Sequence, residues 1–180
     1  MKNKRCIYLI GFMASGKSTV GRLLAEKLGF LFRDIDTIIE GKEGIPIWKI
    51  FETKGEPYFR EIEKRLMREL TQSTKDRGTV IATGGGLPCN QDNLQFMKDH
   101  GLVVYLKLGV NDIILRIGSS SSRPVFQHLR QSATLRESVE TLLTSRENYY
   151  NQADLTIMNS NETDIERVVE EIIKNIKLMK

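Results

Sequence analysis

A glycine-rich segment near the start of the chain, residues 11–18 (GFMASGKS), has the composition and spacing of a phosphate-binding loop. Its glycines leave the backbone free to curl, so that successive N–H groups point at phosphate oxygens. Lys17 would reach the β and γ phosphates of a nucleotide, and the Ser18 hydroxyl would bind the accompanying magnesium ion. A chance glycine-rich turn is the alternative, but a strand-like apolar run precedes the segment and a helical pattern follows it. The segment therefore predicts nucleotide binding.

Two acidic residues, Asp34 and Asp36, lie just past the second apolar run of the chain. In open α/β sheets, ligands bind beyond the carboxyl ends of the strands. In an extended chain these two carboxylates would share one face, because they are two residues apart. One of them could then hold magnesium through a water, and the other could accept a proton from a substrate hydroxyl. The alternative is a turn in which Asp36 caps a helix that begins at Thr37.

A predicted helix carries Arg60 and Glu63 on one face, because the two residues are three positions apart. The forked guanidinium of Arg60 suits a carboxylate ligand, although this stretch by itself favours an ordinary surface ion pair. Three consecutive glycines, residues 84–86, follow the third strand-like run, where a backbone without side chains can lie flat against a ligand. A flexible turn is the alternative at this position.

Three further arginines are candidates for contacts with an anionic ligand. Arg123 lies in a polar, serine-rich segment and could close over nucleotide phosphates. Arg116 ends the preceding helical segment, and Arg146 lies within a long predicted helix. Without further context, Arg123 and Arg116 are solvated charges, and Arg146 could be at the surface, at the edge of the core or facing a ligand.

The composition favours a single globular domain and argues against a nucleic-acid-binding or membrane-spanning protein. With 180 residues, of which 40% are hydrophobic and 28% charged, the chain can form one domain with an ordinary core. A net charge of +4 without a long basic run argues against nucleic-acid binding. No apolar stretch reaches the roughly 20 residues that span a bilayer, and no signal peptide is recognisable. Cys6 and Cys89 lack metal-ligand spacing and are expected to be reduced thiols of a cytoplasmic protein.

The elements that must position these residues alternate between strand-like and helical patterns. The predicted strands are 6–10, 30–33, 80–83, 102–108 and 155–158, and helices are predicted to begin near residues 17, 57, 90, 110, 135 and 162. Such alternation is typical of an α/β fold with a parallel sheet covered on both faces. Residues 36–72 and 118–134 interrupt the alternation, and inserted segments of this kind commonly form substrate pockets and lids.

Together these landmarks resemble the shikimate kinase family over residues 7–158. The phosphate loop alone is generic, but the aspartate pair, the Phe-Arg-x-x-Glu helix at 59–63 and the triple glycine occur in an order specific to that family. The resemblance implies a P-loop kinase three-layer sandwich with a five-stranded parallel sheet in the order 2-3-1-4-5. It implies a single domain over residues 1–180, with a helical substrate-binding insertion at 37–72 and a mobile lid at 118–135.

The activity that the resemblance implies is magnesium-dependent transfer of the γ-phosphoryl group of ATP to the 3-hydroxyl of shikimate, a step of aromatic amino acid (chorismate) biosynthesis. Asp34 would hold Mg²⁺ through a water beside Ser18, and Asp36 would orient or deprotonate the 3-hydroxyl. The implied catalytic residues are Lys17, Asp36 and Arg123. The implied ATP-binding residues are Ala14, Ser15, Gly16, Lys17, Ser18, Thr19, Arg116 and Arg123, with the adenine also near residues 159–161. The implied shikimate-binding residues are Asp36, Arg60, Gly85 and Arg146.

The sequence departs from the usual family pattern in three places. Ala14 stands where a third loop glycine is common, and a positive φ there would cost an alanine about 1 kcal/mol. Val125-Phe126 replaces the usual pair of leucines after Arg123-Pro124, which implies different lid packing. Residues 119–122 are four consecutive serines.

Two alternative functions remain open from the sequence. One is another small-molecule kinase of the same fold that acts on gluconate or a nucleoside monophosphate. A nucleoside monophosphate kinase should have many lid arginines, whereas residues 118–135 contain only Arg123 and Arg130. The other is a nucleotide-binding switch without turnover, which leaves Asp36 and the candidate arginines unexplained. Family analogy predicts a monomer that binds ATP and shikimate, with no nucleic-acid or membrane partner.

Overall fold

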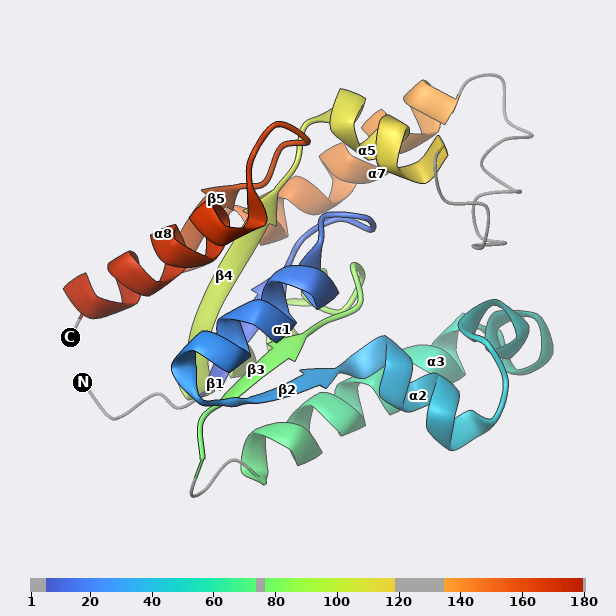
Figure 1. Cartoon of the computed structure of the whole chain (residues 1–180). Helices are drawn as coiled ribbons and strands as arrows, with labels where there is room; N and C mark the ends of the chain where they lie inside the picture. Colours follow the sequence, from blue (N-terminus) through green and yellow to red (C-terminus); the bar gives the residue numbers. More distant parts are fainter. Residues whose placement is uncertain (1–5, 74–76, 119–134, 180) are drawn as a thin grey trace.

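A computed structural model of the chain describes residues 6–73, 77–118 and 135–179. Strands and helices alternate along most of it (Figure 1). In chain order the elements are β1 (Cys6–Ile10), α1 (Lys17–Leu28), β2 (Leu31–Asp34), α2 (Ile35–Glu43), α3 (Ile47–Gln72), β3 (Thr79–Ala82), α4 (Gln91–His100), β4 (Gly101–Lys107), α5 (Val110–Gly118), α7 (Leu135–Tyr150), β5 (Leu155–Met158) and α8 (Ile165–Leu178).

The five strands form one parallel sheet in the order β2-β3-β1-β4-β5, which confirms the predicted topology. Each predicted strand is present, with its boundaries within one residue of those expected. The central strand β1 pairs on both sides, with Cys6 opposite Thr79 of β3 and Gly101 of β4. All five residues of β1 are buried, which is why its sequence is an uninterrupted apolar run.

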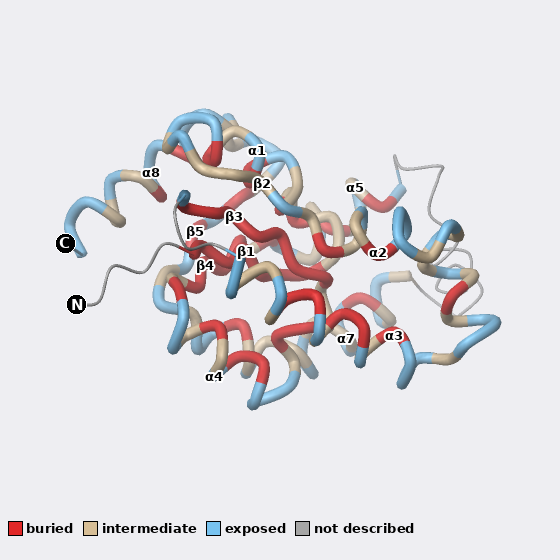
Figure 2. The backbone as a smooth tube through the Cα atoms, turned by 90° about the horizontal axis from the view of Figure 1, so that it is seen from below, coloured by how far each residue is buried: buried red, intermediate tan, exposed pale blue. Residues whose placement is uncertain are grey.

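The alternating side chains of β1 feed two separate cores, one on each face of the sheet. Tyr8 and Ile10 belong to the larger core, to which α2, α3, α4, α5 and α7 contribute. Ile7 and Leu9 belong to the smaller core under α1 and α8. Figure 2 shows the buried strands as a red layer between these two sets of helices. The arrangement is the three-layer sandwich that the sequence predicts.

The helix that carries Arg60 begins earlier than predicted. The sequence favours a start near Pro57, but α3 begins at Ile47 and is interrupted at Gly55, which has φ 81° and ψ 164°. Proline is well suited to the first turn after such a break, so the local signal marks an internal break in α3 and not its beginning. Both segments carry apolar residues into the larger core, among them Ile50 and Phe59, and this packing keeps the first segment helical.

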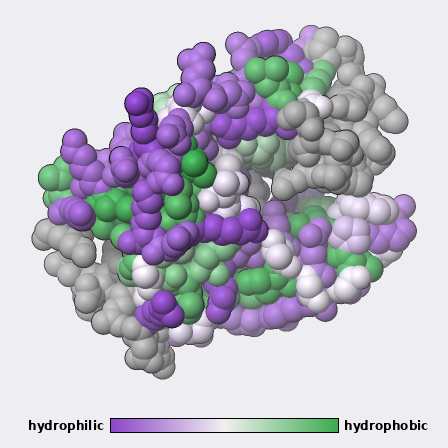
Figure 3. All heavy atoms as spheres, in the orientation of Figure 1, coloured by the Kyte–Doolittle hydropathy of each residue, from purple (hydrophilic) through white to green (hydrophobic). Residues whose placement is uncertain are grey.

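Hydrophilic side chains cover most of the face seen in Figure 3, with smaller apolar patches between them. Among the described residues, no helix is long and apolar enough to cross a membrane. Within the described residues, neither Cys6 nor Cys89 forms a disulfide. Most of the segment expected to act as a lid, with Arg123 and Arg130, lies outside the described residues.

Candidate active site

The phosphate-binding segment forms the turn between β1 and α1. Ala14 has a φ of 63° and Gly16 a φ of 85°, and Gly16 immediately precedes α1. Position 14 thus does adopt the left-handed conformation that favours glycine. Lys17 Nζ donates hydrogen bonds to the carbonyl oxygens of Gly11, at 3.0 Å, and Phe12, at 2.8 Å. The lysine ammonium and the positive end of α1 therefore meet at one loop, as anion binding requires.

Two side chains from elsewhere in the fold hold the backbone of this loop. Asn159, in the loop after β5, donates through Nδ2 to the carbonyl oxygen of Ser15 at 2.7 Å. A Cβ atom on Gly16 would lie only 2.7 Å from the same Nδ2. Arg116 donates to Ala14 O at 3.1 Å and to Asn159 O at 2.8 Å. The structure thus brings Arg116 and the loop after β5 to the phosphate loop.

The candidate metal-binding pair is formed by Ser18 at the start of α1 and Asp34 at the end of β2. Ser18 Oγ donates to Asp34 Oδ2 at 2.5 Å, and Asp34 Oδ1 accepts from the backbone N–H of Thr37 at 3.2 Å. The second contact makes Asp34 the N-cap of α2. Thr19, the next residue of α1, is exposed. One hydroxyl and one fixed carboxylate thus lie together beside the phosphate loop.

This pair fits a cation that is held mainly by phosphates and waters. Among the described residues, no cluster of three or more His, Cys, Asp or Glu side chains could form a complete protein cage for a metal. Mg²⁺ in nucleotide sites usually takes few protein ligands, because substrate phosphates and waters fill the rest of its octahedron. Ser18 and Asp34 are of the chemical type that such an ion uses.

The local structure around Asp36 differs from both sequence-based expectations. Asp36 lies in the first turn of α2, which begins at Ile35, so the two carboxylates do not share one face of an extended strand. The capping alternative is also wrong, because Asp34 and not Asp36 is the cap. β2 continues through Asp34, which pairs with Ala82 of β3, and this pairing fixes where the helix can begin. Asp36 nevertheless approaches the triple-glycine loop: a Cβ on Gly84 would lie 3.0 Å from its Oδ1.

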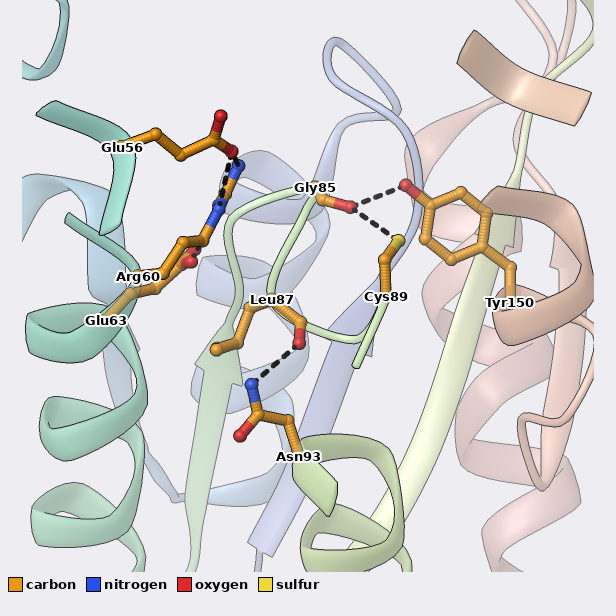
Figure 4. Close-up of polar contacts among 8 residues, drawn as sticks. All are labelled: Glu56, Arg60, Glu63, Gly85, Leu87, Cys89, Asn93 and Tyr150. Carbon is orange, nitrogen blue, oxygen red and sulfur yellow. Dashed lines mark hydrogen bonds and ion pairs between the residues drawn. The ribbon is translucent and has the colours of Figure 1, made fainter. Parts of the chain in front are cut away.

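The Arg60–Glu63 pair is not a surface ion pair. The Glu63 side chain is fully buried, and its Oε2 accepts from Arg60 Nη1 at 2.8 Å. Glu56, which is largely exposed, accepts from Arg60 Nε at 3.0 Å and from Nη2 at 2.8 Å (Figure 4). The guanidinium also lies over the rings of Phe51 and Phe59. Arg60 is therefore fixed in place by two carboxylates and an aromatic wall.

Residues 84–86 form the loop on which the candidate side chains converge. A Cβ on Gly84 would collide with Glu63 Oε1, and one on Gly86 would lie 2.7 Å from Arg60 Nη1. A Cβ on Gly85 would lie 3.3 Å from Arg146 Nη1. Gly84 and Gly86 thus allow a close approach that a side chain would disturb, and the loop is not merely a flexible turn. Arg60 and Arg146 contact neighbouring residues of one loop, although they come from α3 and α7.

The electrostatics of this cluster are dominated by burial. Burial raises the pKa of Glu63 to about 7, although the neighbouring Arg60 guanidinium acts to lower it, and Asp36 raises it further. Burial lowers the pKa of Arg60, but the Glu63 and Glu56 carboxylates outweigh that effect and raise it above its ordinary value. Glu63 therefore interacts with Arg60, Arg146 and Asp36. These two arginines and two carboxyl groups together could bind an anion and accept a proton from a hydroxyl.

Arg146 connects this cluster with the phosphate loop. It is half-buried on α7, and its guanidinium carbon lies 5.8 Å from the ring centroid of Phe12, a residue of the phosphate loop. Together with its contact at Gly85, this places Arg146 between the phosphate loop and the glycine loop. Arg123, the remaining predicted site residue, lies outside the described residues.

The structure adds side chains to the site that the sequence analysis does not predict. Tyr150, on α7, donates its hydroxyl hydrogen bond to the carbonyl oxygen of Gly85 at 2.7 Å. Asn93, on α4, donates to the carbonyl oxygen of Leu87 at 3.1 Å (Figure 4). Nothing in the local sequence marks either residue as a neighbour of the glycine loop. Tyr150 does follow Arg146 by four positions, and this helical spacing is the one signal that could have linked it to the site.

The family model and the relatives that are at least 30% identical to the chain point to one family. The family model described as shikimate kinase matches residues 13–177. The shikimate kinase of Sulfurihydrogenibium sp. (strain YO3AOP1) is 44% identical over 177 residues, with 98% of this chain and 99% of the relative covered. That of Persephonella marina is 40% identical over 173 residues, with 96% and 99% covered. The solved structure of shikimate kinase from Acinetobacter baumannii in complex with shikimate is 38% identical, covers 97% of this chain and 94% of its own, and superposes with a TM-score of 0.85.

The relatives match almost the whole chain in sequence. The solved structure from Acinetobacter baumannii also shares its fold. The match of the family model covers residues 13–18 of the phosphate loop, Asp34, Asp36, Arg60, the glycine loop and α7. This chain belongs to the shikimate kinase family.

Proposed function

We propose that the chain catalyses transfer of the γ-phosphoryl group of ATP to the 3-hydroxyl of shikimate, giving shikimate 3-phosphate and ADP. The observation that carries this proposal is the convergence of Arg60, Arg146 and Asp36 on the glycine loop 84–86, next to the phosphate loop. Shikimate is a small carboxylate with several hydroxyls. Forked cations for an acid and a carboxylate for an alcohol are the groups that recognise such a molecule.

The nucleotide is proposed to bind at the phosphate loop. Lys17 and the backbone N–H groups of residues 14–19 would contact its phosphates, and the Ser18 side chain would lie beside them. Arg116 and the loop after β5, which meet at the Ala14 and Asn159 carbonyls, would lie near the adenine. Arg123 is proposed to contact the ATP phosphates from the segment 118–135, acting as a lid.

The family uses ATP with a divalent metal, and we propose that the ion here is Mg²⁺. Ser18 would bind it directly and Asp34 through a water, in keeping with their 2.5 Å hydrogen bond. The ion would neutralise charge on the phosphate oxygens. The residues of the chain do the rest of the work, which is mainly to align the two reactants and to exclude water.

The substrate is proposed to bind between α2, α3 and the glycine loop, with residues 37–72 as the substrate-binding insertion. Arg60 and Arg146 would bind its carboxylate from two sides, with the Gly85 backbone beside them. Asp36 would accept a hydrogen bond from the 3-hydroxyl and orient it, or remove its proton, as the oxygen attacks phosphorus. A single domain that acts as a monomer in the cytoplasm stays a prediction from family analogy.

A coupled ADP-release assay with shikimate, gluconate and AMP as parallel acceptors, with and without Mg²⁺, tests the proposal. ADP release that depends on shikimate and on Mg²⁺ is the expected result. Turnover with gluconate or AMP in place of shikimate would identify the chain as a different small-molecule kinase. ATP binding without turnover of any of the three would instead favour a nucleotide-binding switch.

A further inference from the structure

The glycine loop is held from behind by a buried tyrosine. Tyr150 is fully buried at the end of α7, and its ring packs on that of Tyr105 with centroids 5.0 Å apart. Its hydroxyl donates to the carbonyl oxygen of Gly85 at 2.7 Å. In Figure 4 this carbonyl points toward Tyr150, on the side of the loop away from Arg60. The hydroxyl of a rigid, buried ring thus fixes the direction of the Gly85 carbonyl in the glycine loop.

Tyr150 is the strong donor among the groups near this carbonyl. The Cys89 thiol also lies toward Gly85 O, but at 3.6 Å, and a thiol is a weak donor. Burial raises the pKa of Tyr150 well above its ordinary value, although the charge of Arg146 and a side-chain hydrogen bond with it act to lower the pKa, so the hydroxyl keeps its proton. The hydroxyl thus links the Gly85 carbonyl to Arg146. Removing the tyrosine hydroxyl would therefore leave the Gly85 carbonyl with only a weak partner among the described residues.

The direction of the Gly85 carbonyl determines the direction of the next amide. The described residues contain no cis peptide bond, so the Gly85 C=O and the Gly86 N–H point in opposite directions. With the carbonyl held toward Tyr150, the Gly86 N–H points to the side of the loop that faces Arg60. Arg60 is close enough there that a Cβ on Gly86 would lie 2.7 Å from its Nη1. Arg146 approaches the same loop one residue earlier, where a Cβ on Gly85 would lie 3.3 Å from its Nη1.

We propose that Tyr150 is a positioning residue for the substrate-binding loop: its hydroxyl fixes the Gly85–Gly86 peptide so that the Gly86 N–H joins Arg60 and Arg146 in binding the carboxylate of the acceptor. The inference rests on the proposed function, because it assumes an acceptor with a carboxylate. Arg146 and Tyr150 are four residues apart on α7, so one face of this helix supplies both a cation for the ligand and the anchor of the loop.

The Tyr150→Phe variant tests this role, with Tyr8→Phe as its matched control. Tyr8 is also a fully buried tyrosine, and its hydroxyl also makes one 2.7 Å hydrogen bond, to Thr71 Oγ1, away from the glycine loop. Both variants lose one buried hydroxyl and keep the ring. For Tyr150→Phe we expect the KM for shikimate to rise about tenfold, while the KM for ATP changes less than about twofold. Tyr8→Phe should leave both KM values within about twofold of wild type.

The outcomes separate this inference from the proposed function. Wild-type turnover of shikimate in the same assay tests the function by itself. If the wild type is active and the shikimate KM of Tyr150→Phe stays at the wild-type value, the positioning role is wrong. An equal rise of the shikimate and ATP KM values in Tyr150→Phe, or the same rise in Tyr8→Phe, would also overturn it, because loss of stability alone would then explain the effect.

A measurement on the wild-type chain does not depend on any variant folding. In a titration with shikimate followed by ¹H–¹⁵N NMR, the Gly86 amide proton should move downfield as it donates to the carboxylate. Methyl shikimate, in which the carboxylate is replaced by an uncharged ester, should produce a much smaller shift. A Gly86 resonance that shikimate leaves in place would contradict the proposal.

Discussion

At the scale of single residues, Glu63 shows how burial sets the chemistry of the site. Its side chain is fully buried, and burial raises its pKa to about 7 even though Arg60 lies 2.8 Å away. In the unfolded chain the same carboxyl group has its ordinary pKa of 4.5. Between these two values the folded state binds a proton that the unfolded state has lost, so the contribution of Glu63 to stability falls as pH rises.

We therefore expect the Glu63→Gln variant to lose part of the pH dependence of stability. From about pH 5 to about pH 8, wild type should lose up to about 3 kcal/mol of unfolding free energy through Glu63, and the variant should not. Urea denaturation of both proteins at a series of pH values measures the difference. Glutamine keeps the shape and an acceptor for Arg60, so the two curves should differ in slope across this window. Parallel curves would show that Glu63 does not titrate there.

Asp36 is the residue at which loss of charge should affect turnover more than folding. In the Asp36→Asn variant we expect kcat to fall at least about 100-fold, because asparagine cannot accept the proton of the 3-hydroxyl. The KM for ATP should change little, because Asp36 lies at the glycine loop. Steady-state kinetics measure both quantities. Asp99→Asn, at an exposed acid on α4, is the control for the loss of a carboxylate, and wild-type-like turnover by Asp36→Asn would remove that residue from the mechanism.

At the scale of elements, the β1–α1 turn contains a backbone conformation that its sequence does not favour. Ala14 has a φ of 63°, for which an L side chain costs about 1–2 kcal/mol. Glycine would remove this cost but would lose slightly more conformational entropy on folding. We expect Ala14→Gly to stabilise the chain by about 1 kcal/mol, measured by urea or thermal denaturation.

The matched control for this prediction is Gly29, the C-cap of α1. Gly29 has a φ of 66°, and a Cβ on it would meet no atom within 4 Å. Gly29→Ala should therefore destabilise the chain by about 1 kcal/mol through the backbone alone. If Gly29→Ala destabilises as expected and Ala14→Gly does not stabilise, interactions of the Ala14 side chain must offset the backbone cost.

The inner strands β1, β3 and β4 were predictable to within one residue because their apolar runs are almost entirely buried on both faces. The edge strands β2 and β5 are partly exposed, and their short runs were predictable from their place in the alternation of strands and helices. The boundary between β2 and α2 could not be predicted, because either Asp34 or Asp36 could cap the helix. Pairing of Asp34 with Ala82 on a neighbouring strand decides between them. The burial of Glu63 and the contact of Tyr150 with Gly85 also depend on packing between distant segments. The local sequence of α3 contains no sign of the burial, and that of α7 contains only the four-residue spacing between Arg146 and Tyr150.

At the scale of the whole molecule, the order of the strands separates two groups of ligand-binding residues. The phosphate loop follows the central strand β1, and the parallel sheet places all strand ends that carry site residues at one edge. Asp36 and the glycine loop follow β2 and β3, which lie on one side of β1. Arg116 and Asn159 follow β4 and β5, which lie on the other side. Arg146 is an exception, because its helix α7 follows β4 in the chain but the side chain approaches Gly85 of the glycine loop. Apart from Arg146, the residues of the proposed acceptor and adenine sites lie on opposite flanks of the phosphate loop.

This separation predicts that two arginine variants will have opposite effects. Arg60→Ala should raise the KM for shikimate at least about tenfold and change the KM for ATP by less than about threefold, because it removes a charged fork from the acceptor side. Arg116→Ala should do the reverse, because it releases the hydrogen bonds to Ala14 O and Asn159 O on the nucleotide side. Arg65→Ala, at a largely exposed arginine of α3, is the control for loss of a charge from the same helix. Equal losses for both substrates in Arg60→Ala would contradict the carboxylate role of Arg60, because loss of a group that binds only the acceptor should not weaken ATP binding by the same factor.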